Sequence, residues 1–300
     1  MKNQLKTVLL LGILSALLVG IGSALGGIAP YAALALALLL NVGAYFFSDK
    51  LVLKMHGARE VSREEQPTLH RMVEELSQAA GLPKPRVFLM EDPQPNAFAT
   101  GRNPEKGVVA VTRGLMELLD ARELRGVIAH ELAHIKNRDI LLSTIAATVA
   151  AAVTYLAHAA GWLSAMAGGQ QDDEEGPSPL QTLALALVAP IAATLIQLGI
   201  SRSREYLADK TGAQISGDPE ALASALDKLQ RGAEQHPTAA QPATASLFIV
   251  SPFAGTERIL ALFSTHPRTE DRVRRLLALS RPGLDREARW SRPGVHGLTP

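Results

Sequence analysis

Four long uncharged apolar stretches constrain the fold of this chain more than any other feature. They cover about residues 7–29, 31–47, 140–168 and 180–200. The first stretch, about 23 residues long, suffices to cross the hydrocarbon core of a bilayer as a helix. A secretory signal peptide is the alternative for that stretch, but its apolar run exceeds a signal core and a second run follows at once. We therefore expect four transmembrane helices arranged as two hairpins.

The distribution of basic residues predicts how these hairpins are oriented. Lysine and arginine flank the outer ends of both hairpins, whereas the two short loops within the hairpins contain neither. The longer of these loops instead holds four acidic residues, Asp172, Asp173, Glu174 and Glu175. Because short loops rich in basic residues stay in the cytoplasm, we expect both termini and the segments 51–139 and 201–280 to be cytosolic.

The composition excludes several kinds of function. The formal net charge is +1, and no basic stripe with interleaved aromatic residues is present, so a nucleic-acid partner is not expected. The chain has no cysteine, which excludes disulfide bonds, thiolate metal ligands and a cysteine nucleophile. Any bound metal ion must therefore be held by histidine, aspartate or glutamate.

The segments outside the apolar stretches predict a mainly helical part with a small β-sheet. Periodicity and punctuation indicate helices at 67–80, 114–120, from Glu123 through HELAHIKNRD, at 201–213, 220–230 and 269–279. Strands are predicted at 86–90, 96–100 and 107–112. The expected domains are a transmembrane hairpin at 1–50, a protease part at 51–139, a second hairpin at 140–200, a further protease part at 201–280 and a disordered tail at 281–300.

The segment His130-Glu131-Leu132-Ala133-His134 fits the metal-binding pattern HExxH. Residues four apart lie on the same face of a helix, so both imidazoles can reach one ion. Glu131 projects about 100° from His130 and about 60° from His134, so its carboxylate can approach a water molecule on the metal without displacing a ligand. This pattern predicts two metal ligands, His130 and His134, and a catalytic base, Glu131.

A catalytic zinc ion usually takes three protein ligands, so a third must come from elsewhere in the chain. Glu205 and Asp209 lie one helical turn apart directly after the fourth apolar stretch, and a hairpin returns that point to the membrane face where His134 lies. We expect Glu205 to bind the ion and Asp209 to accept a hydrogen bond from a ligand imidazole. Asp139 is rotated away from the ligand face of a continuous helix, so we expect it to cap the helix or to form a local ion pair.

These segments resemble the HtpX family of membrane zinc proteases, which are relatives of the prenyl-protein endopeptidase Ste24 in the wider M48 group. The resemblance rests on four motifs in order: NAFATG at 96–101, HELAHIKNRD at 130–139, SRSREYLAD at 201–209, and STHP at 264–267 with Arg272. It implies one Zn²⁺ per subunit, with His130, His134 and Glu205 as ligands and Glu131 as the catalytic residue.

The resemblance also implies a cellular role. It points to a multi-pass protease of the bacterial inner membrane that degrades misfolded or damaged membrane proteins, often under stress. The expected architecture is thus mainly α with a small β-sheet, comprising four transmembrane helices and a cytosolic zincin-type metalloprotease domain. The expected partners are the lipid bilayer and membrane-protein or unfolded polypeptide substrates.

Two further assignments concern how a substrate is held. His266 is a candidate for stabilising the developing oxyanion, although His266-Pro267 also suits the start of the last helix. The strand with Asn96, Ala97, Phe98 and Ala99 can offer main-chain hydrogen bonds to an extended substrate, but plain sheet core is an equal alternative.

Two other functions remain open from the sequence. A prenyl-protein endopeptidase is the first, although the Ste24 branch carries more membrane spans than the four counted here. An inactive membrane scaffold that keeps the protease fold is the second, and the presence of Glu131 argues against it because a structural metal needs only ligands.

Overall fold

The computed structural model describes residues 2–25, 27–146, 148–149, 202–235, 248–249 and 267–280. Most of the predicted spans at 140–168 and 180–200, together with His266 and the tail 281–300, lie outside these residues.

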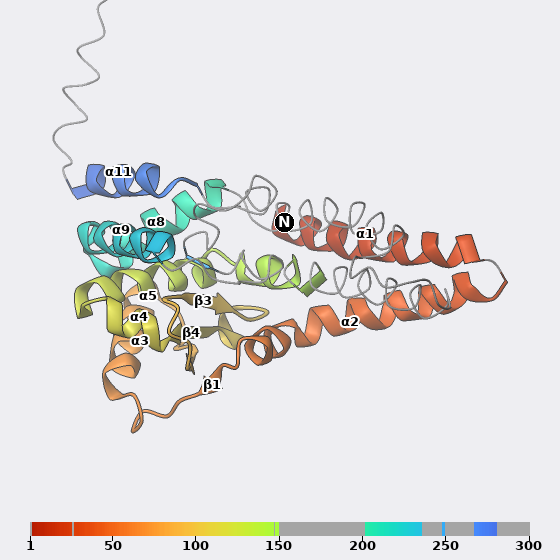
Figure 1. The fold of residues 1–300 in the computed structure, drawn as a ribbon, viewed down its shortest axis with the longest axis horizontal. Helices are drawn as coiled ribbons and strands as arrows, with labels where there is room; N and C mark the ends of the chain where they lie inside the picture. The colour runs from red at the N-terminus through yellow and green to blue at the C-terminus, as the bar shows by residue number, and fades with distance from the viewer. Residues whose placement is uncertain are drawn as a thin grey trace, which may run out of the picture.

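A helical hairpin projects from the rest of the described chain (Figure 1). It consists of α1 (Lys2–Leu25) and α2 (Ala29–Met55), and it turns at Gly27, whose positive φ of 58° suits glycine. The side-chain amide of Asn41 donates a hydrogen bond of 2.8 Å to the Ser15 hydroxyl and so links the two helices.

The outer surface of this hairpin is apolar. Nearly all the exposed large hydrophobic side chains of the described residues lie on α1 and α2, Leu38, Leu39 and Phe47 among them. In the described part of the chain, one helix, Pro30–Met55, is long and apolar enough to cross a membrane. A shorter apolar helix covers Thr7–Gly20. Both properties are typical of helices in contact with lipid rather than water.

The second helix extends beyond the predicted membrane span. That span covers about residues 31–47, and α2 continues to Met55. The reason is burial, because Val52 and Leu53 pack against the β-sheet and are 1% and 6% exposed. The last turns of α2 therefore belong to the body of the protein.

A four-stranded mixed sheet forms one layer of that body. The strands are β1 (Arg59–Glu60), β2 (Arg86–Met90), β3 (Ala97–Thr100) and β4 (Val108–Thr112), in the spatial order β1-β2-β4-β3. β2 and β4 are parallel, and each edge strand is antiparallel to its neighbour. The three predicted strands are confirmed within one residue, whereas the two-residue strand β1 was not predicted.

Both faces of the sheet are covered, which explains why its strands are apolar throughout. One face, with Val87, Leu89 and Val109, packs against α3 and α5 in the main core. The opposite face, with Phe88 and Ala110, packs against the end of α2.

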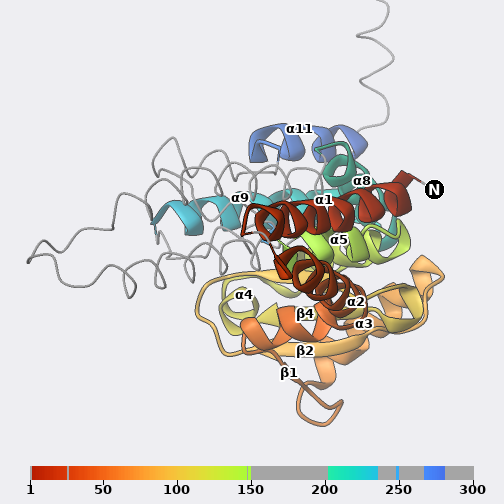
Figure 2. The same cartoon turned by 90° about the vertical axis from the view of Figure 1, so that its right-hand side faces the viewer.

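The helices are stacked on the sheet in layers (Figure 1 and Figure 2). α5 (Ala121–Lys136) lies next to the sheet, α8 (Arg202–Ser216) and α9 (Pro219–Gln235) lie over α5, and α11 (Thr269–Ser280) lies outermost. The remaining elements are α3 (Pro67–Ala80), α4 (Arg113–Leu118) and the 3₁₀ turn Pro104–Lys106. α5 is therefore the central helix, with the sheet on one side and the C-terminal helices on the other.

The predicted continuous helix through HELAHIKNRD is wrong in one respect. α5 ends at Lys136, Arg138 adopts a left-handed φ of 55°, and helical backbone resumes at Ile140. This break turns the side chain of Asp139 toward His134.

Candidate metal centre

The two histidines of the HExxH segment are held by a strongly defined helix. Asp120 caps α5 by accepting hydrogen bonds from the backbone N–H groups of Arg122 and Glu123, and the Glu123 carboxylate accepts one from Asp120 N–H. Such a capping box satisfies backbone donors that the helix itself leaves unpaired. His130 and His134 follow on the same face, one turn apart, with ring centroids 4.7 Å apart.

α8 brings the acidic residues of SRSREYLAD to these rings. The two helices approach closely because α8 carries Gly212 at the contact, where an added Cβ would lie only 2.9 Å from the backbone of His130. Glu205 and Asp209, one turn apart on α8, are both buried, with 4% and 3% exposure. A residue larger than glycine at 212 would push the carboxylates away from the imidazoles.

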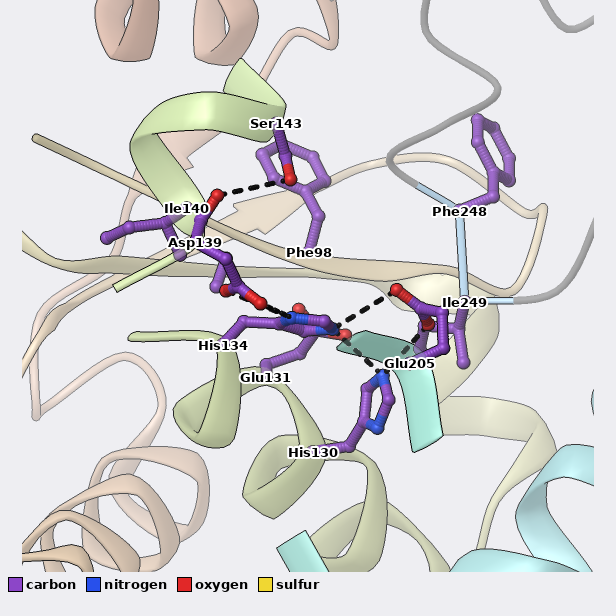
Figure 3. A pocket seen from close by; sticks show the side chains of 11 residues that line it. Phe98, His130, Glu131, His134, Asp139, Ile140, Ser143, Glu205, Phe248 and Ile249 are labelled. Carbon is purple, nitrogen blue, oxygen red and sulfur yellow. Dashed lines mark hydrogen bonds and ion pairs between the residues drawn. The ribbon is translucent and has the colours of Figure 1, made fainter. Parts of the chain in front are cut away.

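His130, His134 and Glu205 converge on one point (Figure 3). The two Nε2 atoms are 3.2 Å apart, His130 Nε2 lies 3.7 Å from Glu205 Oε2, and His134 Nε2 lies 3.8 Å from Glu205 Oε1. Tetrahedral zinc with bonds of about 2.0–2.1 Å places its ligand atoms about 3.3 Å apart. The donor set and its spacing therefore fit a zinc ion, and each residue offers one ligand atom within 4.8 Å of the others.

The Nδ1 atom of each imidazole faces a carboxylate. His130 Nδ1 lies 3.0 Å from Asp209 Oδ1, although its N–H direction is poorly aligned with that oxygen. His134 Nδ1 lies 3.2 Å from both oxygens of Asp139. A carboxylate on Nδ1 favours the tautomer whose Nε2 lone pair can bind a metal.

The local ion pair expected for Asp139 is thus confirmed, but the geometric reason given for it is wrong. Asp139 was placed on a continuous helix that turned it away from the ligand face. Because α5 ends at Lys136, the chain folds back and Asp139 supports His134 directly.

Sequence reasoning missed the part that Arg272 plays. This residue lies on α11, is 1% exposed, and donates hydrogen bonds of 2.9 and 2.7 Å to the two oxygens of Asp209. In the sequence it stands only as the last residue of a motif. A signal was available, however, because α11 is an amphipathic helix of 12 residues. An arginine on the core-facing side of such a helix needs a buried partner.

Glu131 lies beside the metal ligands without joining them. Glu131 is 5% exposed, and the backbone N–H of Ala99 on β3 favours its ionised form. Burial raises the pKa of Glu131 to about 7, and Glu205 adds to the rise while His134 opposes it. A carboxyl group with this pKa can both accept and return a proton near neutral pH.

The surrounding charges act differently on the other groups. Burial lowers the pKa of His134, but Asp139, Glu205 and Glu131 outweigh it and raise the value to about 10. Burial alone dominates at His130 and lowers its pKa. Burial also disfavours ionised Asp209, yet Arg272 and His130 bring its pKa down to about 2, so this carboxylate stays charged.

A pocket opens onto these groups. It is bounded by the three candidate ligands, Glu131 and Asp139 on its polar side. Its apolar wall is formed by Phe98, Ile140, Phe248 and Ile249 (Figure 3).

The structure places the remaining predicted residues as follows. Phe98 and Ala99 line the pocket, whereas Asn96 and Ala97 are buried nearby without lining it. β3 is a buried strand, as the sheet-core alternative has it, and it is also an edge of the sheet, so substrate binding by this segment stays a prediction. His266 lies outside the described residues.

Comparisons with known proteins identify the family of this chain. The model of peptidase family M48 matches residues 63–280. The chain is 53% identical to "Protease HtpX homolog" of Syntrophobacter fumaroxidans, over 93% of this chain and 100% of the relative. It is 50% identical to the protein of that name from Paraburkholderia phytofirmans, over 94% of this chain and 99% of the relative.

A solved structure, that of S. mikatae Ste24p, is also similar, with a TM-score of 0.45 and 17% identity, covering 82% of this chain and 57% of that one. The family match spans well over half of the chain and includes every candidate ligand. The chain therefore belongs to peptidase family M48 and is a hydrolase of the metalloprotease class.

Proposed function

We propose that this chain is an integral-membrane, zinc-dependent endopeptidase with its site at the cytosolic membrane face. One observation carries the proposal: His130, His134 and Glu205, from two helices distant in sequence, bring one ligand atom each within 4.8 Å of the others, with the buried Glu131 beside them. One Zn²⁺ held by these three side chains keeps a coordination position open, as catalytic zinc sites do.

The residues of the chain divide the chemistry among them. When bound, zinc supplies Lewis-acid activation of a water molecule and of the scissile carbonyl group. Glu131 takes the proton of the attacking water and returns it to the leaving amine. Asp209 and Asp139 keep the imidazoles oriented, and the apolar wall of the pocket excludes bulk water.

An extended substrate would be held along β3. This strand is an edge of the sheet, and it reaches the reacting groups because Ala99 lines the same pocket as Glu131. Main-chain recognition at a sheet edge depends on an accessible, unfolded segment more than on its side chains. We therefore assign Asn96, Ala97, Phe98 and Ala99 to substrate binding and expect broad specificity.

Membrane-protein quality control is the role that we propose for this activity. The apolar outer surface of the hairpin and the burial of Val52 and Leu53 at the sheet support a site close to a bilayer. The relatives named protease HtpX homolog align with this chain over nearly their whole length. The remaining spans, the bacterial inner-membrane location, cytosolic termini and a role for His266 are part of the same proposal.

Cleavage of casein by the purified, detergent-solubilised protein tests the proposed activity. The wild type should cleave, and a chelator or Glu131→Gln should reduce cleavage by about 100-fold or more, while Glu131→Gln should keep its zinc. Glu117→Gln is a matched control, since Glu117 is an exposed glutamate on α4 away from the site. Equal background cleavage in all samples would leave the scaffold function as the better account.

A further inference from the structure

Arg272 is the largest fully buried side chain among the described residues, and its charge needs an explanation. Moving a guanidinium out of water is costly unless it is paired and hydrogen-bonded. Arg272 meets this need with two kinds of partner from different parts of the chain, a carboxylate on α8 and a backbone carbonyl group on the segment 248–249.

The first partner belongs to the support of a candidate zinc ligand. Arg272 Nε and Nη2 donate to the two oxygens of Asp209 at 2.9 and 2.7 Å, and Asp209 Oδ1 also faces His130 Nδ1. With both oxygens engaged, the carboxylate cannot rotate about its Cβ–Cγ bond. Asp209 Oδ1 is therefore held 3.0 Å from His130 Nδ1.

The second partner belongs to the wall of the pocket. Arg272 Nη1 donates a hydrogen bond of 2.8 Å to the backbone carbonyl of Ile249, and Ile249 N–H in turn donates to Asn96 Oδ1 at 3.3 Å. Phe248 and Ile249, which these bonds anchor, line the pocket together with Phe98. Asp209 does not line the pocket.

We propose that Arg272 is a positioning residue that couples the orientation of His130 to the position of the Phe248–Ile249 wall. This inference rests on the proposed zinc-peptidase function and adds to it a link between metal binding and substrate binding. Arg272 does not itself touch the substrate in this account. It acts through Asp209 on one side and through Ile249 on the other.

Arginine is required for this coupling because of its geometry. The guanidinium presents its donors in a fixed fork, so one group can bind a carboxylate at two points and still donate in a third direction. It has no lone pair and cannot compete for the metal, even though Nη2 lies 3.4 Å from His130 Nε2. A lysine at this position would keep the charge but could not make all three bonds at once.

Arg272→Lys is the principal test, with zinc affinity measured by competition with a chromophoric chelator and KM measured on a fluorogenic peptide at saturating zinc. We expect zinc affinity to fall about 10- to 100-fold, as for other groups that orient a ligand. We expect KM to rise about tenfold from the loss of the bond to Ile249. Arg274→Lys, at an exposed position of the same helix, should change neither quantity.

Two further variants test the contacts of Arg272 with Ile249 and with Asp209 separately. Asn96→Ala removes the other anchor of Ile249 but keeps the main chain through which Asn96 is proposed to bind substrate, so a rise in KM would report the wall, and zinc affinity should stay unchanged. Asp209→Asn should weaken zinc binding and also raise KM at saturating zinc, because Arg272 loses its fixed partner and the wall moves with it. Asp209 does not line the pocket, so a change in KM in Asp209→Asn must be transmitted to the pocket from outside it. This variant therefore tests the coupling even if Arg272→Lys fails to fold.

The outcomes distinguish this proposal from the proposed function. If the wild type neither binds zinc nor cleaves the peptide, the function itself is wrong. If the wild type does both, but Arg272→Lys lowers only thermal stability, or Asp209→Asn leaves KM unchanged at saturating zinc, the coupling is refuted. Changes in both zinc affinity and KM in Arg272→Lys, with no change in Arg274→Lys, support it.

Discussion

The two candidate histidine ligands sit in different surroundings although they lie one turn apart. The side chain of His130 is 1% exposed and faces Asp209, which α11 holds in turn through Arg272. The side chain of His134 is 17% exposed and faces Asp139, which comes from the turn that ends α5. One ligand is thus supported by tertiary packing and the other by local chain geometry, and disturbances should weaken the two sides of the site unequally.

Glu205 lies near both histidines, so its removal should have the largest effect on zinc binding. We expect Glu205→Ala to lose stoichiometric zinc, because two imidazoles alone leave the ion with too few protein ligands. Metal analysis after gel filtration measures this directly. Full zinc content in Glu205→Ala would show that the third ligand has been misassigned.

The two supporting carboxylates provide the next comparison. Asp209→Asn and Asp139→Asn should both weaken zinc binding, within the roughly 10- to 100-fold range known for such residues, with the larger loss at Asp209. The reason is that Asp209→Asn also leaves the buried Arg272 without its charge partner. Chelator competition with both variants is the measurement. A larger loss of zinc affinity in Asp139→Asn than in Asp209→Asn would contradict this prediction.

Acidification should act mainly through the His134 side. The pKa of His134 is raised to about 10 in the metal-free site, so zinc must displace a proton at neutral pH. Apparent zinc affinity should therefore rise with pH, by about tenfold per unit below the pKa of this histidine, and fall as the pH drops.

Asp139→Asn sharpens this test. It removes the first of the charges that raise the pKa of His134, so the dependence should level off at a lower pH than in the wild type. Competition titrations at several pH values give both curves. A flat wild-type curve across neutral pH would contradict the assignment of His134 as the protonated ligand.

The smallest effect should come from the helix contact that brings the two sides together. Gly212→Ala places a Cβ 2.9 Å from the backbone of His130 and should destabilise the fold by about 1–3 kcal/mol. Gly232→Ala is the matched control, because its nearest atom lies 3.9 Å away and alanine favours helices. Thermal unfolding of both variants measures the difference, and equal stability would mean that α8 can shift without cost.

Sequence reasoning located those features that depend on local patterns. Strand β2 and helix α3 follow from apolar runs and punctuation, and both are predicted in place. The ligand pair on α5 follows from helical periodicity alone. The convergence of Glu205 with this pair was expected because a hairpin returns the chain to its starting side.

Features that depend on tertiary contacts were out of reach. Nothing local to α2 shows that Val52 and Leu53 cover a sheet formed later in the chain, so the helical turns beyond the predicted span could not be foreseen. The break before Asp139 depends on a left-handed residue, Arg138, that is neither glycine nor asparagine. Arg272 meets Asp209 across 63 residues, and no periodicity encodes that pairing.

Anomalous diffraction at the zinc edge from crystals of the zinc-loaded protein tests the central claim most directly, namely that α5 and α8 share one ion. Our account predicts a single strong peak at about 2.0–2.2 Å from His130 Nε2, His134 Nε2 and a Glu205 carboxylate oxygen. A peak bound to the histidines with Glu205 turned into solvent or lipid would contradict it.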